Sequence, residues 1–253
     1  MSRPPALIRV DEHDHGVRLL TLREPDRRNA MSEEMGAQLR SAVAAMRAQG
    51  TRVLVVTGAG SAFCAGADLP ALFGDPDQPV TATHARLQSY YRAFLDVFDL
   101  PFVTIAAVNG PAVGAGLNLA LACDLRLAGV EASFGATFTR IGLHPGGGCT
   151  WFLVRQLGAA RALRTLLLGE TLDAQQAVAW GLAEGPHDDP VRAGLELADR
   201  VARLEPELAR HVKRSVRLAV STGDLDAVLE YESWAQAASS SSDRLQEWVA
   251  RFR

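Results

Sequence analysis

The sequence predicts an α/β fold in which buried parallel strands alternate with helices, followed by a C-terminal helical region. Residues 16–22 and 51–58 are short runs rich in leucine and β-branched residues, and turn residues bound both runs. Between them, residues 32–50 carry apolar side chains at helical spacing, with Ser32 as the candidate N-cap and Gly50 as the stop signal. A strand, a helix and a second strand in this order form the unit of a parallel sheet.

The same alternation continues along the chain. We expect two further strands, over residues 102–110 and 125–129. We expect four further helices, over residues 115–124, 150–158, 160–169 and 171–185. Residues 75–83 contain proline, aspartate and threonine without periodicity, so they are the best candidate for a mobile loop.

The character of the sequence changes at about Pro190, after which nearly every residue follows a helical period. We therefore divide the chain into an α/β core with the binding site over residues 1–189 and a helical region over residues 190–253. The four serines at 239–242 are too few for a linker and are better explained as a helix-cap turn.

Composition and charge exclude several classes of function. The 253 residues carry a formal net charge of -3 and no basic run, so we expect no nucleic-acid partner. No apolar stretch is long enough for a signal peptide or a membrane span. The three scattered cysteines favour a reducing, cytoplasmic setting over a disulfide framework. Neither CxxC nor HExxH is present, so no metal cofactor is expected.

Two glycine-rich loops each follow a predicted strand, "TGAGSAFCAGADL" at 57–69 and "VNGPAVGAGLNLA" at 108–120. Neither contains a Walker A motif or a GxGxxG dinucleotide fingerprint. Small residues let a backbone approach a ligand closely, and the N–H groups at a helix start are unpaired donors. Taken singly, each loop is more often a tight strand–helix connection. Taken together, two backbone N–H groups can converge on one oxygen, which is the geometry of an oxyanion hole.

Four segments, in order and with matching spacing, resemble the enoyl-CoA hydratase/isomerase (crotonase) family. They are "SAFCAGADL", "PFVTIAAVNGPAVGAGLNLALACDLRLA", "FTRIGLHPGGGCTWFLVRQLG" and "LLLGETLDAQQAVAWGLA". The resemblance implies a crotonase-like spiral of ββα units with a C-terminal helical region that packs trimers, often as a dimer of trimers. It also implies an acyl-CoA thioester as the ligand, with coenzyme A as part of the substrate and no separate cofactor.

The resemblance places the family's two oxyanion donors on the backbone N–H groups of Ala67 and Ala115. The second donor belongs to an alanine, where glycine is commoner. This difference matters little because the donor is the backbone N–H and not the side chain. Two donors on a thioester oxygen stabilise the charge that develops as the thioester becomes an enolate, and removing one costs about 10²–10³ in rate.

The resemblance also assigns residues along the bound coenzyme A. Asp68 and Leu69 continue the segment that lines the pantetheine path. Arg28, Asn29 and Ala30 match the short motif that approaches the nucleotide end of coenzyme A. All five assignments are expectations from the family pattern.

The sequence departs from that pattern at both acid–base positions. A hydratase of this family uses two glutamates, and their positions here hold Asn118 and Phe138. An amide can hold a water or a carbonyl, and a phenyl ring can only pack. Losing a positioned acid–base group costs about 10²–10⁴ in rate. Efficient hydration by the usual route is therefore not expected.

His144, in "HPGGGCTWF", is the candidate replacement, because it stands where relatives usually carry an apolar residue and histidine suits proton transfer near neutral pH. The alternative is a histidine that hydrogen-bonds its own turn. Arg140 either binds a carboxylate or phosphate of the ligand or caps a neighbouring helix. Cys149 is either a nucleophile at a helix start, with His144 as its base, or a small packed cysteine.

Five other residues carry weaker signals. His84, Tyr90 and Tyr91 fall in the region that usually covers the acyl pocket, and they either contact substrate or are surface residues of a helix. Asp124 matches a structural acid, as does Glu131.

Three functions follow from these observations. The first is an enzyme of lyase or isomerase type that stabilises a thioester enolate and uses His144 and Asn118 in place of the glutamates. The second is an acyl-CoA-binding protein that has lost catalysis on the same scaffold. The third is an ordinary hydratase of fatty acid metabolism, against which both replacements count. We favour the first.

Overall fold

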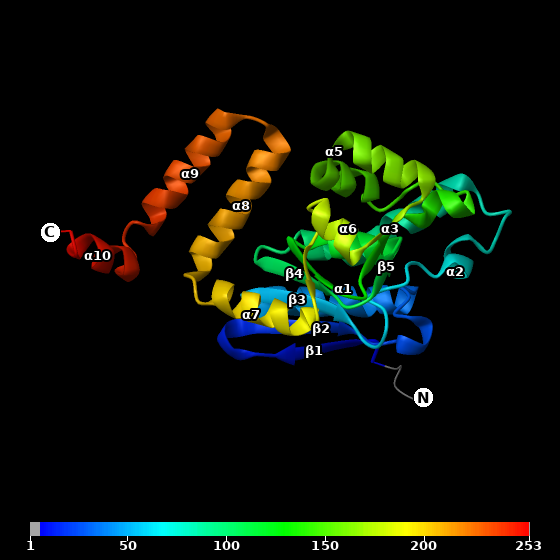
Figure 1. The fold of residues 1–253 in the computed structure, drawn as a ribbon, viewed down its shortest axis with the longest axis horizontal. Coiled ribbons are helices and arrows are strands. Elements are labelled where there is room, and N and C mark those ends of the chain that lie inside the picture. The colour runs from blue at the N-terminus through cyan, green and yellow to red at the C-terminus, as the bar shows by residue number, and fades with distance from the viewer. Residues whose placement is uncertain (1–5, 253) are drawn as a thin grey trace.

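The computed structural model describes residues 6–252 of the chain (Figure 1). Its main sheet has the order β1-β2-β3-β4-β6-β9, with β1 antiparallel to β2 and the other pairs parallel. The six strands are β1 (Ile8–Glu12), β2 (Val17–Leu22), β3 (Val53–Gly58), β4 (Val103–Val108), β6 (Leu125–Gly129) and β9 (Glu184–His187). A second sheet has the order β5-β7-β8, formed by β5 (Pro111–Val113), β7 (Ser133–Gly135) and β8 (Thr171–Asp173).

Helices cover both faces of the main sheet. The first helices along the chain are α1 (Glu33–Ala48), α2 (Leu69–Phe73), α3 (Val80–Phe98), α4 (Ala115–Ala122), α5 (Cys149–Leu168) and α6 (Ala174–Ala179). The last are α7 (Pro190–Ala202), α8 (Pro206–Thr222), α9 (Leu225–Ser239) and α10 (Asp243–Ala250). Three short 3-10 turns are η1 (Asp14–Gly16), η2 (Pro25–Arg27) and η3 (Thr137–Ile141).

The central strands read as continuous apolar runs because they are buried on both faces. In β3, Leu54 and Val56 belong to the large core that contains α1, α3 and α4, whereas Val53 and Val55 face α7 on the other side. This two-sided burial is what parallel strands require, and the α/β fold class predicted from the sequence is confirmed.

Several predicted elements are confirmed with small shifts at their ends. The four predicted strands correspond to β2, β3, β4 and β6. The helix expected over 32–50 is α1, and the Ser32 side chain accepts a hydrogen bond from Met35 N–H as an N-cap. The two helices expected over 150–169 are the two parts of α5, which a kink at Gly158, with φ 74° and ψ 164°, separates.

Other predictions are wrong. The single helix expected over 171–185 is instead strand β8, the short helix α6 and strand β9. The loop expected over 75–83 is shorter, since α3 begins at Val80. The strands β1, β5 and β7 were not predicted, because β1 is polar and the other two have only 3 residues each.

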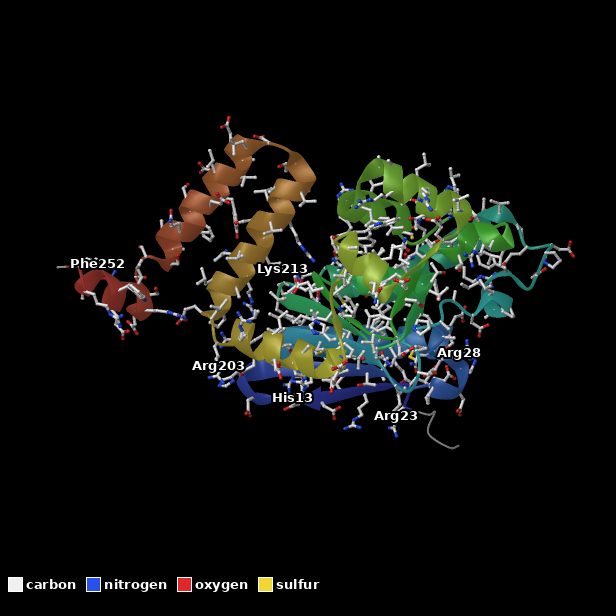
Figure 2. The ribbon with its side chains drawn as sticks, viewed as in Figure 1. His13, Arg23, Arg28, Arg203, Lys213 and Phe252 are labelled. Atoms are coloured by element: carbon white, nitrogen blue, oxygen red, sulfur yellow. The ribbon has the colours of Figure 1, made fainter. Side chains whose placement is uncertain are left out.

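The C-terminal helices differ in how they meet the core. α7 packs on the main sheet through Ala198 and Ala202, whereas α8 and α9 form a hairpin that projects away from it (Figure 1). Lys213 of α8 points back to the core (Figure 2), and Phe252 lies at the far end of the chain. The boundary predicted at residue 190 stays a prediction. Within residues 6–252, no helix is long and apolar enough to cross a membrane.

Candidate functional site

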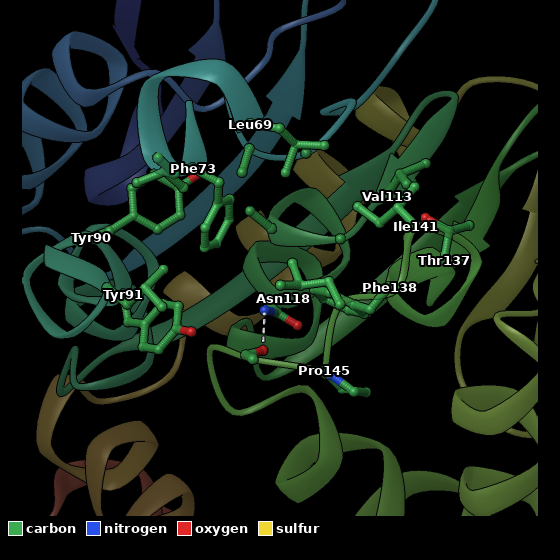
Figure 3. A pocket seen from close by; sticks show the side chains of 18 of the residues that line it. Leu69, Phe73, Tyr90, Tyr91, Val113, Asn118, Thr137, Phe138, Ile141 and Pro145 are labelled. Atoms are coloured by element: carbon green, nitrogen blue, oxygen red, sulfur yellow. Dashed lines mark hydrogen bonds between the residues drawn. The ribbon is translucent and has the colours of Figure 1, made fainter. Parts of the chain in front are cut away.

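A cavity of about 350 Å³ opens between α3, the N-terminal end of α4 and the segment that follows β7 (Figure 3). Its walls come from four parts of the chain, residues 65–73, 87–94, 113–118 and 137–146. Most of the wall is apolar. The candidate site residues are described below by their place relative to this cavity.

Ala67 lines the cavity, and hydrogen bonds of its two neighbours to Met31 hold its backbone in place. Met31 N–H donates to Gly66 O at 2.7 Å, and Asp68 N–H donates to Met31 O at 3.4 Å, which forms a parallel bridge between Met31 and Ala67. Since successive N–H groups of an extended chain point to opposite sides, the N–H of Ala67 points away from Met31. Gly66 has φ 106°, and a Cβ there would stand only 2.9 Å from Val113 O.

Ala115 is the first residue of α4, so its N–H is one of the donors that a helix start leaves unpaired. Gly114 precedes it with φ 52° and ψ -112°. A Cβ on Gly66 would stand 3.9 Å from Ala115 N, which shows how closely the two glycine-rich loops approach each other. Among residues 6–252, neither Ala67 N–H nor Ala115 N–H donates to a backbone acceptor. The structure therefore brings the two predicted donors to one cavity.

Asn118 lies one helical turn beyond Ala115 and is 2% exposed. Its Nδ2 donates to Gly146 O at 2.9 Å, which is the dashed line in Figure 3. A carbonyl oxygen can only accept, so this bond fixes which end of the amide is nitrogen. The buried Oδ1 has no partner within the described chain. Asn118 thus ties the turn at Gly146 to α4 and leaves one free acceptor.

Phe138, in η3, lines the cavity opposite α3. A Cβ on Gly114 would stand 4.0 Å from the Phe138 ring, so the ring lies over the start of α4. It packs there and carries no proton, as its residue type requires.

His144 lines the cavity at an exposed position. Its Nδ1 lies 2.8 Å from Pro145 O, and because the carbonyl accepts, Nδ1 carries the hydrogen of this bond. In the neutral ring, Nε2 then keeps its lone pair. Both interpretations of His144 are therefore compatible with its position, since the ring bonds its own turn and also reaches the cavity.

Tyr90 and Tyr91 both line the cavity, so their interpretation as surface residues of a helix is wrong. The Tyr90 hydroxyl donates to Met31 O at 2.9 Å. Burial raises the pKa of the Tyr91 hydroxyl, while the Gly147 N–H acts in the opposite direction. His84 is exposed on the same helix and does not line the cavity. Tyr90 and Tyr91 share a helical spacing with Leu87 and Phe94, and this spacing is the sequence signal that could have predicted that the tyrosines line the cavity.

The predicted coenzyme A motif lies beside the cavity and outside its lining. Arg28 is exposed (Figure 2), and its carbonyl accepts from Ala65 N–H at 2.9 Å. Asn29 is fully buried, and its Nδ2 donates to Ala59 O and Ala62 O at 2.9 and 2.8 Å. Ala30 is half-buried. Asn29 therefore shapes the glycine-rich loop from inside, while Arg28 stays accessible.

Asp68 and Leu69, at the start of α2, have different surroundings. Leu69 lines the cavity, whereas Asp68 caps α2 through Ala71 N–H and pairs with Arg27 at 2.8 Å. The hydrogen bond from Arg27 lowers the pKa of the Asp68 carboxyl. The carboxylate thus holds the loop in place from outside the cavity.

Arg140 does not line the cavity. A Cβ on Gly169 would stand 2.9 Å from Arg140 Cγ, so the side chain packs over the C-terminal end of α5. This placement favours the helix-end interpretation over the ligand-binding one.

Cys149 is buried, and burial raises its pKa to about 12. Its interpretation as a nucleophile is therefore wrong, because the reactive thiolate is disfavoured. Asp124 is a structural acid, as predicted. It accepts from Thr104 N–H at 2.8 Å and pairs with Lys213 at 2.6 Å. Glu131 is exposed and outside the cavity. No group of metal-ligating side chains occurs among the residues that the structure describes.

Comparison with known proteins agrees with this geometry. The model of the family described as enoyl-CoA hydratase/isomerase matches residues 12–253. The chain is 50% identical over 228 residues to a protein of Mycobacterium tuberculosis named "Probable enoyl-CoA hydratase EchA14", covering 88% of this chain and 85% of that one. It is 36% identical over 248 residues to the 1,2-epoxyphenylacetyl-CoA isomerase of Escherichia coli, covering 94% and 92%. The crystal structure of an enoyl-CoA hydratase from Bacillus anthracis superposes with a TM-score of 0.86 at 31% identity, covering 98% and 96%.

Proposed function

The chain belongs to the enoyl-CoA hydratase/isomerase family, and from that premise we propose that it forms enolates of acyl-CoA thioesters without the two family glutamates. The thioester carbonyl oxygen accepts hydrogen bonds from Ala67 N–H and Ala115 N–H. The observation that carries this proposal is the pair of unpaired backbone donors beside one largely apolar cavity. Donors fixed in advance at a site with little water stabilise developing negative charge strongly.

His144 is the proton carrier in this proposal. Its Nε2 takes a proton from the carbon next to the thioester carbonyl, the C–H electrons pass into the enolate, and the charge rests on the oxygen held by the two donors. The Nδ1–H bond to Pro145 O supports the neutral tautomer that such a base needs. Return of the proton to the same carbon gives exchange, and return to another carbon gives isomerisation. Decarboxylation, hydrolysis and a restricted hydration would use the same enolate or oxyanion stabilisation.

A second candidate is an acyl-CoA-binding protein without catalysis. Asn118 and Phe138 favour it, since neither side chain exchanges protons near neutral pH. The exposed position of His144 on its own turn favours it as well.

The bound thioester extends from the cavity past Leu69 towards the exposed Arg28. In this arrangement the pantetheine follows the segment at Asp68 and Leu69, and the nucleotide end lies near Arg28 and Ala30. Arg28 supplies an accessible cation for a phosphate group. We assign Arg140 no part in binding, because it packs against α5.

The test is exchange of α-protons with deuterium oxide, measured by mass spectrometry on a panel of enoyl-, β-keto- and saturated acyl-CoA thioesters. We expect the native protein to exchange and His144→Gln to lose about 10²–10⁴ in rate. Tight binding of these thioesters without exchange or turnover would establish the binding protein instead. Exchange that is indifferent to His144→Gln would contradict the assigned base.

A further inference from the structure

The acyl end of the cavity has aromatic rings on two facing walls. Aromatic residues form 6% of the chain, yet five of them line this one cavity. One wall carries Phe73, Tyr90, Tyr91 and Phe94 from α2 and α3, and the opposite wall carries Phe138 from η3. Figure 3 shows Phe73, Tyr90 and Tyr91 on one side of the cavity and Phe138 on the other, with Asn118 between them.

The rings of α3 are held against one another in fixed orientations. Tyr91 and Phe94 have centroids 6.0 Å apart, and Tyr90 and Phe94 meet edge to face at 6.5 Å with an interplanar angle of 80°. The Tyr90 hydroxyl is anchored on Met31 O. Because these rings cannot turn freely, the wall presents a preformed aromatic surface and does not adapt to a flexible chain.

Phe138 lies beside Gly114, one of the glycines that form the site. A Cβ on Gly114 would stand 4.0 Å from two atoms of the Phe138 ring, so the ring lies over the backbone that leads into Ala115. A group attached to a carbonyl held at Ala115 N–H therefore meets the Phe138 ring directly. A phenyl ring at the acid–base position removes a proton carrier and adds a packing surface.

Asn118 lies between the two walls and is 2% exposed, and its Oδ1 is buried without a partner within the described chain. Asn118 Nδ2 is already committed to Gly146 O. An aromatic ring has a positively polarised edge, whereas an aliphatic chain offers this oxygen no complementary charge.

We propose that the acyl group taken by this site carries an aromatic ring, seated between the Tyr91–Phe94 wall and Phe138 with its edge towards Asn118. The proposal rests on the proposed function, because it assumes that the thioester carbonyl lies at Ala67 and Ala115. The cavity volume of about 350 Å³ limits the size of the acyl group to a single ring on a short linker.

The test compares two ligands that differ in aromaticity and not in carbon number. Phenylacetyl-CoA and cyclohexylacetyl-CoA are titrated into the native protein by isothermal titration calorimetry, with octanoyl-CoA as the linear ligand of equal carbon number. An aromatic pair gains enough beyond buried area to tighten Kd about twofold to tenfold. We expect phenylacetyl-CoA to bind that much more tightly than both others. Equal or weaker binding of phenylacetyl-CoA would overturn the proposal.

Two variants test whether the aromatic walls of the cavity cause the preference for phenylacetyl-CoA. Phe138→Leu removes the ring of one wall and keeps an apolar side chain, and we expect it to bring the ratio of the two Kd values towards one. Ile141→Leu changes an aliphatic lining residue and serves as the matched control, with the ratio kept. A ratio that survives Phe138→Leu would contradict the assigned seat of the ring. Should Phe138→Leu fail to fold, the native protein with the three ligands decides the matter alone.

The outcomes separate this inference from the proposed function. Equal binding of the phenyl and cyclohexyl thioesters, with α-proton exchange, would remove the aromatic preference and leave the enolate chemistry standing. Absence of binding for every thioester would overturn both. Aromatic preference without exchange would support the inference on a binding protein.

Discussion

At the scale of single residues, the site combines two fixed backbone donors with side chains that differ from a hydratase. Asn118 acts as a clamp on the turn at Gly146, and its buried oxygen has no partner within the described chain. Phe138 contributes packing. His144 is the remaining side chain at the cavity that suits proton transfer near neutral pH. In our proposal, proton transfer at this site is therefore assigned to His144.

Thiol reactivity gives the first prediction at this scale. Burial raises the pKa of Cys64 to about 11, and that of Cys123 and Cys149 to about 12. Because each raised pKa lies well above 8, almost no thiolate forms in the folded protein at pH 8. We expect iodoacetamide to leave all three unmodified in the folded state and to alkylate all three in urea. Rapid labelling of Cys149 in the folded protein would reopen its role as a nucleophile.

The structure brings some of the candidate residues named from the sequence to one cavity and places others outside it, for physical reasons. Ala67, Ala115 and His144 do meet at one cavity, because glycine-rich loops after parallel strands collect at one edge of a sheet. Arg140 was misplaced, since the direction of its side chain depends on packing against α5. Tyr91 was left open between a substrate contact and a surface residue, although the helical spacing that it shares with Leu87 and Phe94 indicates one lining face of the helix.

At the scale of secondary-structure elements, α8 is tied to the core by a buried charge cluster. Asp124, at the start of β6, pairs with Lys213 at 2.6 Å and Arg217 at 3.2 Å, and Lys213 Nζ also donates to Phe102 O at 2.6 Å. Burial lowers the pKa of Lys213, while Asp124 acts in the opposite direction. The cluster therefore fixes where the projecting hairpin of α8 and α9 leaves the core.

Breaking this cluster is the second prediction. Asp124→Asn leaves the Lys213 ammonium buried without its counter-charge, so we expect a loss of about 3 kcal/mol in the free energy of unfolding. Lys213→Met removes the charge and keeps the aliphatic stem, and it should cost clearly less. Urea unfolding measures both. Equal losses from the two variants would show that the charge pair itself is not what holds α8.

The strands that the sequence did not predict were missed for two reasons. The prediction merged β8 and β9 with α6 into one helix, because the apolar residues of α6, which lies between the two strands, dominate the local hydrophobic pattern. β5 and β7 are too short to show an alternation, and they form only because each pairs with a distant segment. Central strands such as β3 were predictable, since burial on both faces makes the whole run apolar.

At the scale of the whole molecule, the projecting helices expose apolar surface. Leu208, Val212, Val216 and Val220 repeat every four residues along α8 and are each exposed. Val212, Val216 and Val220 border a groove of about 750 Å³ between α8 and the core, which Trp151 and Phe152 also line. We propose that a second copy of this chain covers this surface, giving a homotrimer or a dimer of trimers, as the family resemblance implies.

Oligomeric state is the third prediction. Val216→Asp places a charge in the exposed apolar row of α8, and we expect it to shift the protein towards monomer in light scattering after size exclusion. Val80→Asp is the matched control, because Val80 is 84% exposed at the start of α3 and lies outside the groove. A native protein that is monomeric at micromolar concentration would contradict the proposed assembly.

The carbonyl stretching frequency of a bound thioester, labelled with carbon-13 at that carbonyl, tests the two backbone donors most directly. Isotope-edited infrared spectra would compare the native protein with Ala115→Gly, which keeps the N–H, and Ala115→Pro, which removes it at a helix position that tolerates proline. We predict a bound frequency below that in water for the native protein and Ala115→Gly, and loss of most of that shift in Ala115→Pro. A native frequency like that of the thioester in an apolar solvent would contradict the account.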